Sequence, residues 1–353
     1  MPNLLDLSQE ELTAFFTEEL GEPPFRARQI WPWLWQKLER NFSEMTDLSV
    51  KARAKLEDKA CILWPKIVDL QISQDQTKKF LLELEDGERI ETVLIPSVDH
   101  EGRIRWAQCL STQVGCPMGC TFCATGSLGF SRNLTVSEIL GQVLIGKEHL
   151  KDYRSDHPIL RNLVFMGMGE PLLNLTNLLR SLTILNDPKG LAFSPRRITV
   201  STCGIEEGLL RLGASGLCYL AVSLHAPNQE LRERLMPRAA LLPLDRLIDL
   251  LSNYPVKTRE RITFEYLLLK GVNDTPKDAH ALAKIVHRVN GKLNLIVYNP
   301  TPGSPYAAPD SDRVLAFEQI LWSHHVTAIA RASHGKDIDA ACGQLRARHE
   351  TKP

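Results

Sequence analysis

From about residue 104 onward, short apolar runs alternate along the chain with longer segments of mixed character. Short apolar runs bounded by turn-forming residues are typical of buried strands, and most of the segments between them have helical periodicity. This alternation predicts an α/β fold with a parallel sheet, whose ligands gather beyond the carboxyl ends of the strands. The predicted strands are IRWAQCLST (104–112), NLVFMG (162–167), RITVST (197–202), CYLAVSLH (218–225), ITFEYLLL (262–269), LNLIVY (293–298) and VTAIAR (326–331).

The first 60 residues or so lack this alternation and are predicted to be helical. Ser8 and Glu11 match a helix capping box, and PFRARQIWPWLW (24–35) has apolar residues at helical spacing. Two interpretations of residues 24–35 stay open. The segment forms a small helical core with a solvated basic edge, or it belongs to an RNA-binding module in which tryptophans and arginines contact bases and phosphates.

Residues 78–96 predict a β-hairpin. The strand-like segments KKFLLELE and RIETVLIP flank Asp86-Gly87, a strong turn signal. Glu91 lies inside the second strand, where composition alone gives it no role. We therefore expect an N-terminal helical accessory domain (1–75), a β-hairpin extension (76–103), an α/β domain (104–345) and a C-terminal tail (346–353).

Composition narrows the class of protein. The 353 residues suggest about two domains, and the 43% of hydrophobic residues are ordinary for a globular chain. The formal net charge is zero, so contact with RNA would depend on local basic patches. The sequence has no apolar run of transmembrane length and no signal peptide pattern, so no membrane partner is expected. Eight cysteines favour a metal cluster in a reducing cytoplasm over a disulfide framework.

The densest candidate chemistry is the segment Cys116-Pro-Met-Gly-Cys120-Thr-Phe-Cys123. A zinc site or a ferredoxin run would normally supply four ligands, whereas the next cysteine downstream is Cys203. Three thiolates on a four-iron cubane leave one iron open to chelate a small molecule. The CxxxCxxC spacing resembles the signature of radical S-adenosylmethionine (SAM) enzymes, with a zinc knuckle or an accidental cluster as alternatives. Phe122 is expected to shield such a cluster from water.

Polar, glycine and cysteine residues recur at the predicted carboxyl ends of the strands. The glycines of GMGEP (167–171) let backbone amides approach a ligand, and Glu170 offers a carboxylate to an ammonium group or to ribose hydroxyls. Each segment alone is more often an ordinary loop, but five of them at one edge indicate a ligand site. They are the cysteine loop, Gly167–Pro171, Ser201–Gly204, Ser223–His225 and Asn299-Pro300.

Several long motifs resemble the RlmN/Cfr family of radical SAM RNA methyltransferases. The resemblance covers nearly the whole chain. It implies a partial, open (β/α)6 barrel over residues 104–345, preceded by the small helical domain and the β-hairpin. The motifs are CLSTQVGCPMGCTFCATGSLGFSRNLT (109–135), GMGEPLLN (167–174), SLHAPN (223–228), HGKDIDAACGQL (334–345), FRARQI (25–30) and FSEMTDLS (42–49).

The resemblance also implies site residues, position by position. Cys342 corresponds to the cysteine that carries the methyl group, Cys109 to the second redox cysteine, and Glu91 to the proton acceptor. The ligands of a [4Fe-4S] cluster correspond to Cys116, Cys120 and Cys123. The SAM-contacting positions are Gly169, Glu170, Ser201, Ser223, Leu224, His225 and Asn299. The thiols that match no role, and are expected to be buried or incidental, are Cys61, Cys203 and Cys218.

The chemistry implied by the resemblance uses two molecules of SAM per turnover. One methylates Cys342 by displacement, and the other, bound at the cluster, provides the radical that activates this methyl group. The activated carbon adds to an adenine ring carbon, Glu91 removes the ring proton, and Cys109 forms a disulfide with Cys342 to release methylated RNA. The implied substrates are an adenosine in the peptidyl-transferase loop of 23S rRNA and the adenosine after the anticodon of certain tRNAs, each extruded from its stack.

The implied partners are these RNAs and an electron donor such as flavodoxin or ferredoxin, and a monomer is expected. Two alternatives to carbon-2 methylation stay open. Within the family, the Cfr branch methylates carbon 8 of adenine, although FRARQIWPWLW and FSEMTDLS resemble the RlmN branch more closely. From a different class, a non-catalytic iron–sulfur protein could bind RNA or transfer electrons. Candidate phosphate contacts are Arg196, Arg197, Arg232, Arg234, Arg238, Arg259 and Arg261.

Overall fold

The computed structural model describes residues 1–153, 158–257, 260–301, 303–331 and 333–345, so the predicted tail and Arg259 lie outside the described residues. Across this part of the chain, one ten-stranded sheet has the order β1-β2-β3-β4-β7-β8-β9-β10-β11-β12. Strands from β4 onward pair in parallel, and β1 to β4 pair antiparallel. Their bounds are β1 Lys66–Ile72, β2 Lys78–Glu83, β3 Arg89–Val98, β4 Ile104–Cys109, β7 Leu160–Phe165, β8 Ile198–Thr202, β9 Tyr219–Ser223, β10 Thr263–Leu268, β11 Lys292–Val297 and β12 Ala328–Arg331.

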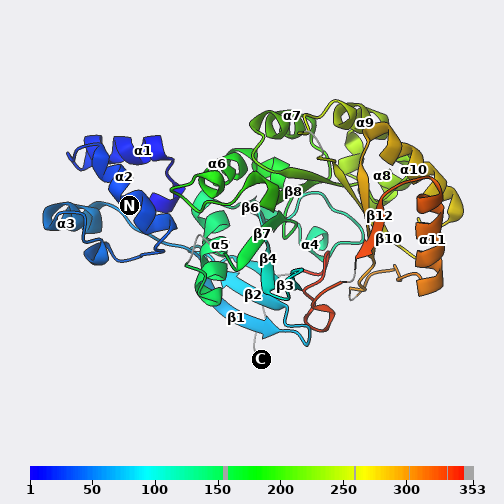
Figure 1. Ribbon diagram of the computed structural model, residues 1–353, viewed down its shortest axis with the longest axis horizontal. Helices are drawn as coiled ribbons and strands as arrows, with labels where there is room; N and C mark the ends of the chain where they lie inside the picture. The colour runs from blue at the N-terminus through cyan, green and yellow to red at the C-terminus, as the bar shows by residue number, and fades with distance from the viewer. Residues whose placement is uncertain (154–157, 258–259, 302, 332, 346–353) are drawn as a thin grey trace.

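Helices connect the parallel strands and cover the outside of the curved sheet (Figure 1). The two end strands of the order, β1 and β12, do not pair with each other, so the barrel is open. The predicted α/β fold, a partial barrel of βα units, is therefore confirmed. The connecting helices are α5 Val136–Leu150, α6 Leu175–Asn186, α7 Glu206–Ser215, α8 Gln229–Leu235, α9 Leu244–Ser252, α10 Pro276–Val289 and α11 Ser311–Ser323.

Local sequence explains both kinds of element. All residues of β10 are buried, as expected for a strand covered on both faces, and its sequence is correspondingly almost continuously apolar. Helix α9 buries Leu244, Leu247, Ile248 and Leu251, the spacing of a single helical face. The capping box predicted at Ser8 begins α1 (Gln9–Ala14), and another at Thr135 begins α5.

The N-terminal helices α1, α2 (Phe25–Trp35) and α3 (Val50–Lys59) form a separate lobe beside the barrel (Figure 1). The side chains of Trp31 and Trp35 are buried and meet edge to face, with ring centroids 5.7 Å apart. The indole of Trp33 donates a hydrogen bond to Asp47 at 2.6 Å. Trp31 and Trp35 therefore belong to a small helical core, while Trp33 is half-buried and Arg28 is exposed. The interpretation of this segment as RNA-binding stays a prediction.

The predicted β-hairpin is confirmed, because β2 and β3 pair antiparallel around a turn in which Gly87 has a φ of 83°. Strand β1 was not predicted. It is an edge strand with almost every residue exposed, so its sequence lacks the alternation that marks a half-buried strand. Two shorter strands, β5 Gln113–Gly115 and β6 Phe130–Asn133, flank the cysteine loop and the short helix α4 (Ala124–Ser127). No helix within the described residues combines the length and the apolar character needed to cross a bilayer.

Candidate active site

The cysteine loop follows β5 and is fixed by backbone hydrogen bonds. The amide of Cys116 donates to the carbonyl of Gly129 at 2.7 Å, and the amide of Thr121 donates to the carbonyl of Leu235 at 3.0 Å. Gly115 has a φ of 74°, and a Cβ there would lie 2.1 Å from the Gly129 oxygen. Only glycine fits this close approach, so the turn into the loop requires it.

One cavity at the carboxyl ends of the strands brings most of the predicted site residues together. Its wall is largely apolar, and Phe122 is buried with its ring against His225 at a centroid distance of 5.0 Å. Burial raises the pKa of the Cys116 thiol to about 12 and also raises that of Cys120. The predicted residues that line this cavity are Cys116, Cys120, Cys123, Gly169, Glu170, Ser201, Ser223, His225 and Cys342. Cys203, which was given no role, lines it too.

Glu170 anchors the loop after β7 to the end of β8. Its carboxylate accepts hydrogen bonds from the Thr202 hydroxyl at 2.6 Å and from the Cys203 amide at 2.9 Å. The neighbouring Gly169 has a φ of 102°, and a Cβ there would lie 2.6 Å from the Gln113 side chain. The glycine is therefore needed for packing against Gln113, a reason that the GMGEP motif alone did not reveal.

A second carboxylate, which was not predicted, enters the cavity from β10. The Ser201 hydroxyl donates to Glu265 at 2.5 Å, and the Ser223 hydroxyl lies 3.5 Å from the same oxygen. Glu265 is buried, which raises the pKa of its carboxyl group. A glutamate inside an apolar run was the available signal, because burying a carboxyl group is costly unless hydrogen bonds satisfy it.

His225 is held as a neutral imidazole. Its Nδ1 accepts a hydrogen bond from the Leu267 amide at 3.0 Å, which leaves Nε2 as the protonated nitrogen. Burial, and then the charge of Arg232, lower the pKa of His225 to about 3. The side chain therefore offers an N–H donor without adding charge to the cavity.

Two predicted SAM-contacting residues do not line this cavity. Leu224 is fully buried in the main core, because successive side chains at a strand end point to opposite faces and Ser223 and His225 take the cavity side. Asn299 is also buried, and its amide nitrogen has no hydrogen-bond partner among the described residues. Leu224 could therefore contact a cavity ligand only through its backbone.

Cys342 is tied to the cysteine loop although 219 positions of sequence separate it from Cys123 (342 − 123). The Ala124 amide donates to the Gly343 carbonyl at 2.8 Å, and the Thr125 hydroxyl donates to the Leu345 carbonyl at 2.7 Å. Cys342 is exposed to solvent, yet enough protein surrounds it to raise the pKa of its thiol to about 11.

A second cavity adjoins the first, and both Cys342 and Glu265 line the two of them. Cys109 lines the second cavity only. It is buried at the end of β4, and burial and then the nearby Cys342 thiol raise its pKa. Both thiols are free.

Glu91 lines neither cavity. It is buried on β3, and the Ser111 hydroxyl donates to its backbone oxygen at 2.6 Å. The Lys79 ammonium lies 3.4 Å from the Glu91 carboxylate and also 3.4 Å from the backbone oxygen of Asp339. Lys79 therefore links Glu91 to the segment that carries Cys342.

Comparisons with known proteins agree with this geometry. Residues 2–62 match the ribosomal RNA large subunit methyltransferase N-terminal domain, and residues 110–283 match the radical SAM superfamily. The dual-specificity RNA methyltransferase RlmN of Nitratidesulfovibrio vulgaris (strain DP4) is 65% identical over 347 residues, covering 98% of this chain and 95% of that protein. The chain belongs to the RlmN family of radical SAM methyltransferases.

Other known proteins are similar over the same extent. The dual-specificity RNA methyltransferase RlmN of Lawsonia intracellularis is 56% identical, covering 98% of this chain and 97% of that protein. The crystal structure of a radical SAM methyltransferase from Sphaerobacter thermophilus is 40% identical and superposes with a TM-score of 0.90, covering 99% of this chain and 100% of that one. The cofactors of this family are a [4Fe-4S] cluster and SAM.

The residues present fit these cofactors. Arg232 is fully buried, and no carboxylate within the described residues forms an ion pair with it. It lies close enough to Cys120 for its charge to lower the pKa of that thiol, and so would compensate the negative charge of thiolates. The buried amide nitrogen of Asn299 lacks a hydrogen-bond acceptor among the described residues. No three His, Cys, Asp or Glu side chains in the described part of the chain are arranged to hold a single metal ion.

The fold buries one of the predicted phosphate contacts and places the other described ones at the two ends of the parallel strands. Arg232 was wrongly expected to contact phosphate, because its guanidinium donates to the backbone oxygens of Cys203 at 2.6 Å and Leu224 at 3.4 Å. The arginines that follow β9, on the side of the cysteine cavity, are the exposed Arg234 and Arg238. Those near the amino ends of β8 and β10 are Arg196, Arg197 and Arg261.

Proposed function

We propose that this chain methylates carbon 2 of an adenosine in 23S rRNA and of the adenosine that follows the anticodon in certain tRNAs. The names and extent of the RlmN relatives support a dual-specificity RNA substrate. The observation that carries the proposal is that Cys342 and the three loop cysteines line one cavity. A thiol beside a cluster site is what a methyl group carried on cysteine requires.

The proposed roles follow from where the side chains lie. With Cys116, Cys120 and Cys123 as ligands, a bound [4Fe-4S] cluster and SAM supply the radical chemistry. Ser201, Ser223, His225 and Asn299 would orient SAM through hydroxyl, imidazole and amide hydrogen bonds.

Cys342 would be the nucleophile that accepts a methyl group, and only its thiolate is reactive. Because the pKa of Cys342 is about 11, methyl transfer needs a proton acceptor close by. Glu265 lines the same two cavities as Cys342 and is proposed to take that proton.

Cys109 and Glu91 are proposed to act after carbon–carbon bond formation. Glu91 would take the proton from the adenine ring carbon, with Lys79 fixing its carboxylate. The radical adduct formed on the adenine ring must also lose one electron, which a bound cluster would take back. Cys109 would then attack the sulfur of Cys342, so that a disulfide forms as the sulfur–carbon bond breaks, the released carbon takes up a proton and methylated RNA leaves. Two electrons must then reduce that disulfide before the next turnover.

The proposed partners are rRNA, tRNA and an electron donor of the flavodoxin or ferredoxin type, and the proposed working form is a monomer. A reducing cytoplasm is the proposed compartment, because cluster ligands must be thiolates and all eight cysteines are free.

The deciding experiment supplies anaerobically reconstituted protein with a reductant, an rRNA fragment and SAM that carries a deuterated methyl group. Mass spectrometry of the digested nucleosides should find adenosine methylated at carbon 2 with one deuterium lost. Substitution at carbon 8 would instead assign the chain to Cfr-type chemistry. A methyl group that kept all of its deuterium would contradict the route through Cys342, and a failure to cleave SAM would favour a non-catalytic iron–sulfur protein.

A further inference from the structure

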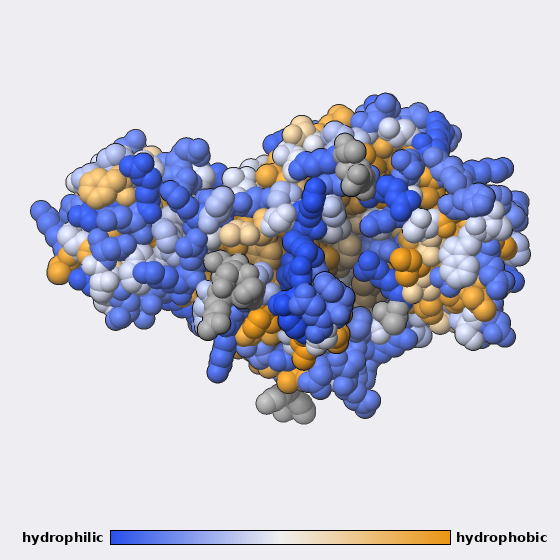
Figure 2. Space-filling view, in the orientation of Figure 1, coloured by the Kyte–Doolittle hydropathy of each residue, from blue (hydrophilic) through white to orange (hydrophobic). Residues whose placement is uncertain are grey.

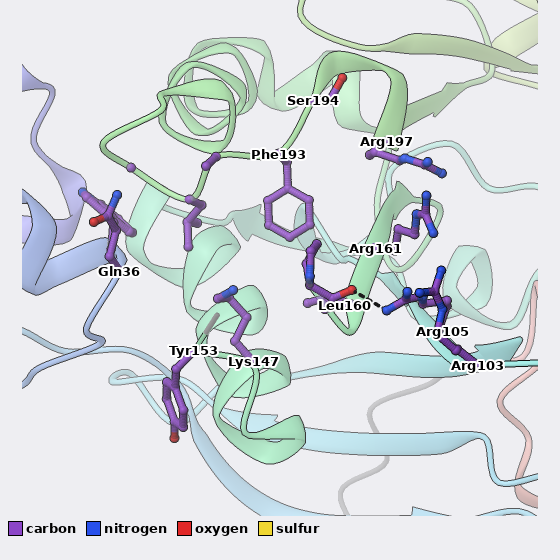
Figure 3. A pocket seen from close by; sticks show the side chains of 15 residues that line it. Gln36, Arg103, Arg105, Lys147, Tyr153, Leu160, Arg161, Phe193, Ser194 and Arg197 are labelled. Carbon is purple, nitrogen blue, oxygen red and sulfur yellow. Dashed lines mark hydrogen bonds between the residues drawn. The ribbon is translucent and has the colours of Figure 1, made fainter. Parts of the chain in front are cut away.

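A separate cavity of about 540 Å³ lies at the opposite edge of the sheet from the cysteine cavity. It opens at the amino ends of β4, β7 and β8, and the residues that line it are drawn in Figure 3. Trp35 and Gln36 close one side of it, so the N-terminal lobe and the barrel together form its wall. None of the chemistry proposed above uses this cavity.

An arginine stands at the start of each of the three neighbouring strands. Arg105 is the second residue of β4, Arg161 is the second residue of β7, and Arg197 directly precedes β8. Figure 3 shows these three side chains as a column on one side of the cavity, with the Phe193 ring and Lys147 on the other side. Because the strands are parallel neighbours in the sheet, the fold gathers residues that are far apart in sequence.

The cavity is strongly positive although the chain has no net charge. Among its described lining residues are five cationic side chains and no Asp or Glu: the cations are Arg103, Arg105, Lys147, Arg161 and Arg197. The chain as a whole balances 42 Lys and Arg against 42 Asp and Glu. A local excess of this kind is the electrostatic footprint of a site for anions.

Two of these cations have no counter-ion within the described residues. Arg103 and Arg105 both bind Asp99 at 3.1 Å, and Lys147 lies 3.8 Å from Asp152. Arg161 and Arg197 form no ion pair with any described residue. Burial, and then the charge of Arg161, lower the pKa of Arg197, so the pair is close enough to repel. A bound anion would remove this repulsion.

The wall of the cavity is held by hydrogen bonds on both sides. The Trp31 indole donates to the Asp187 carboxylate at 2.9 Å, and the Gln36 amide donates to the Pro188 oxygen at 3.2 Å, which ties the lobe to the loop after α6. On the facing side, the Arg105 guanidinium donates to the Pro158 oxygen at 3.2 Å, the bond dashed in Figure 3. The cations are therefore presented by a structured wall.

We propose that this cavity, centred on Arg161 and Arg197, binds backbone phosphates of the RNA substrate. The inference rests on the proposed function, which supplies an RNA. Guanidinium groups form a fork of donors that matches phosphate oxygens, and a column of them suits successive phosphates better than a single small anion. The face is also open, since Arg103, Tyr153 and Ser194 are exposed.

The two ends of the barrel would then hold one RNA at two places. Arg105 and Cys109 are four positions apart, as are Arg197 and Ser201. Four positions span roughly 13 Å along a strand at about 3.3 Å per residue. The path from one end of the strands to the other around the outside of the barrel is longer than this. Only an RNA that extends well beyond the target adenosine can therefore reach both ends. Contacts at the amino end would add affinity without touching the reacting base.

The test compares R161Q/R197Q with R246Q/R288Q in full-length, cluster-loaded protein. The control also removes two arginine charges, but from the outer helices, where Arg246 pairs with Glu206 and Arg288 with Asp249. Binding of a full-length tRNA transcript is measured at several salt concentrations. We expect R161Q/R197Q to bind about tenfold more weakly at moderate salt, with the slope of log K against log salt smaller by about 1.5.

RNA-independent cleavage of SAM serves as the measure of an intact catalytic end and should be equal in all three proteins. A short single-stranded fragment around the target adenosine should bind wild type and R161Q/R197Q equally. If R161Q/R197Q binds the full transcript with the affinity and salt slope of the control, the inference is wrong. Loss of inorganic pyrophosphate or ATP binding with unchanged tRNA binding would also overturn it, in favour of a free nucleotide. A wild-type protein that neither binds nor methylates RNA would instead contradict the proposed function.

Discussion

The two ends of the parallel strands carry opposite kinds of chemistry. At the carboxyl ends, thiols and carboxylates line cavities in which Glu170, His225 and Glu265 are buried. At the amino ends, five cations line a cavity with exposed rims. Figure 2 shows a band of hydrophilic residues down the centre of one face of the molecule. The sheet thus separates a site lined by thiols and buried carboxylates from one lined by cations.

The difference lies in what burial does to charge. At the carboxyl end it favours neutral forms, since it raises the pKa of the Cys342 thiol and the Glu265 carboxyl and lowers that of His225. At the amino end Arg161 and Arg197 are only half-buried and form no ion pair with a described residue. Substitutions at the carboxyl end should therefore change rates, and substitutions at the amino end should change RNA affinity.

The largest effect is expected for Cys342→Ala. Without the thiol that would carry the methyl group, methylation of RNA should fall by about 10³-fold or more, because no other group replaces a covalent nucleophile. The measurement is transfer of labelled methyl groups from SAM to RNA. Cys218→Ala is the matched control, since it removes another thiol that lies outside the cavity. A C342A protein that still methylated RNA would remove the role proposed for Cys342.

A smaller effect is expected for Glu265→Gln. Glutamine keeps an oxygen for the Ser201 hydroxyl but cannot accept a proton from Cys342, so methylation of that cysteine should slow by about 10²-fold. The measurement is methyl-cysteine formed in the protein without RNA, followed by mass spectrometry across a range of pH. Raising the pH toward 11 should rescue the variant, because the pKa of Cys342 is about 11. An equal loss at every pH would indicate a structural role for Glu265 instead.

The same comparison shows how much of the site the sequence could predict. The apolar runs predicted seven strands of the barrel, and the CxxxCxxC spacing predicted the loop, because both patterns are local. Glu265 and Arg232 were missed or misassigned, since each lies in a segment whose partners come from other βα units. The arginines of the amino end were equally invisible as a group. A lone arginine before a strand is usually solvated, and only the order of the strands brings three of them together.

Acid should destabilise the protein through His225. The folded state holds this group with a pKa of about 3, below its ordinary 6.5, so the unfolded chain binds more protons between these values and stability is lost as pH falls. Between pH 7.5 and 5.5 the loss attributable to His225 should be about 1.4 kcal/mol. The measurement is the free energy of unfolding of wild type and His225→Gln at both pH values. His100→Gln, on an exposed loop, is the control and should keep the wild-type pH dependence.

The smallest effect is expected for a substitution at the amino ends of the strands. Unlike the changes above, it should improve a property of the protein, its stability. Without RNA, Arg161→Gln removes the repulsion on Arg197 and breaks no ion pair with a described residue. The protein should therefore become slightly more stable, by about 0.3 kcal/mol or roughly 1 °C in Tm, the scale of interactions between partly exposed charges. The gain should shrink as salt is added, because screening weakens the same repulsion in wild type. Arg105→Gln, which breaks the ion pair with Asp99, should destabilise the protein instead. If Arg161→Gln lowered Tm as much as Arg105→Gln, Arg161 would be a structural residue of the wall. The contrast between an end where burial favours neutral groups and an end that presents unpaired cations would then fail.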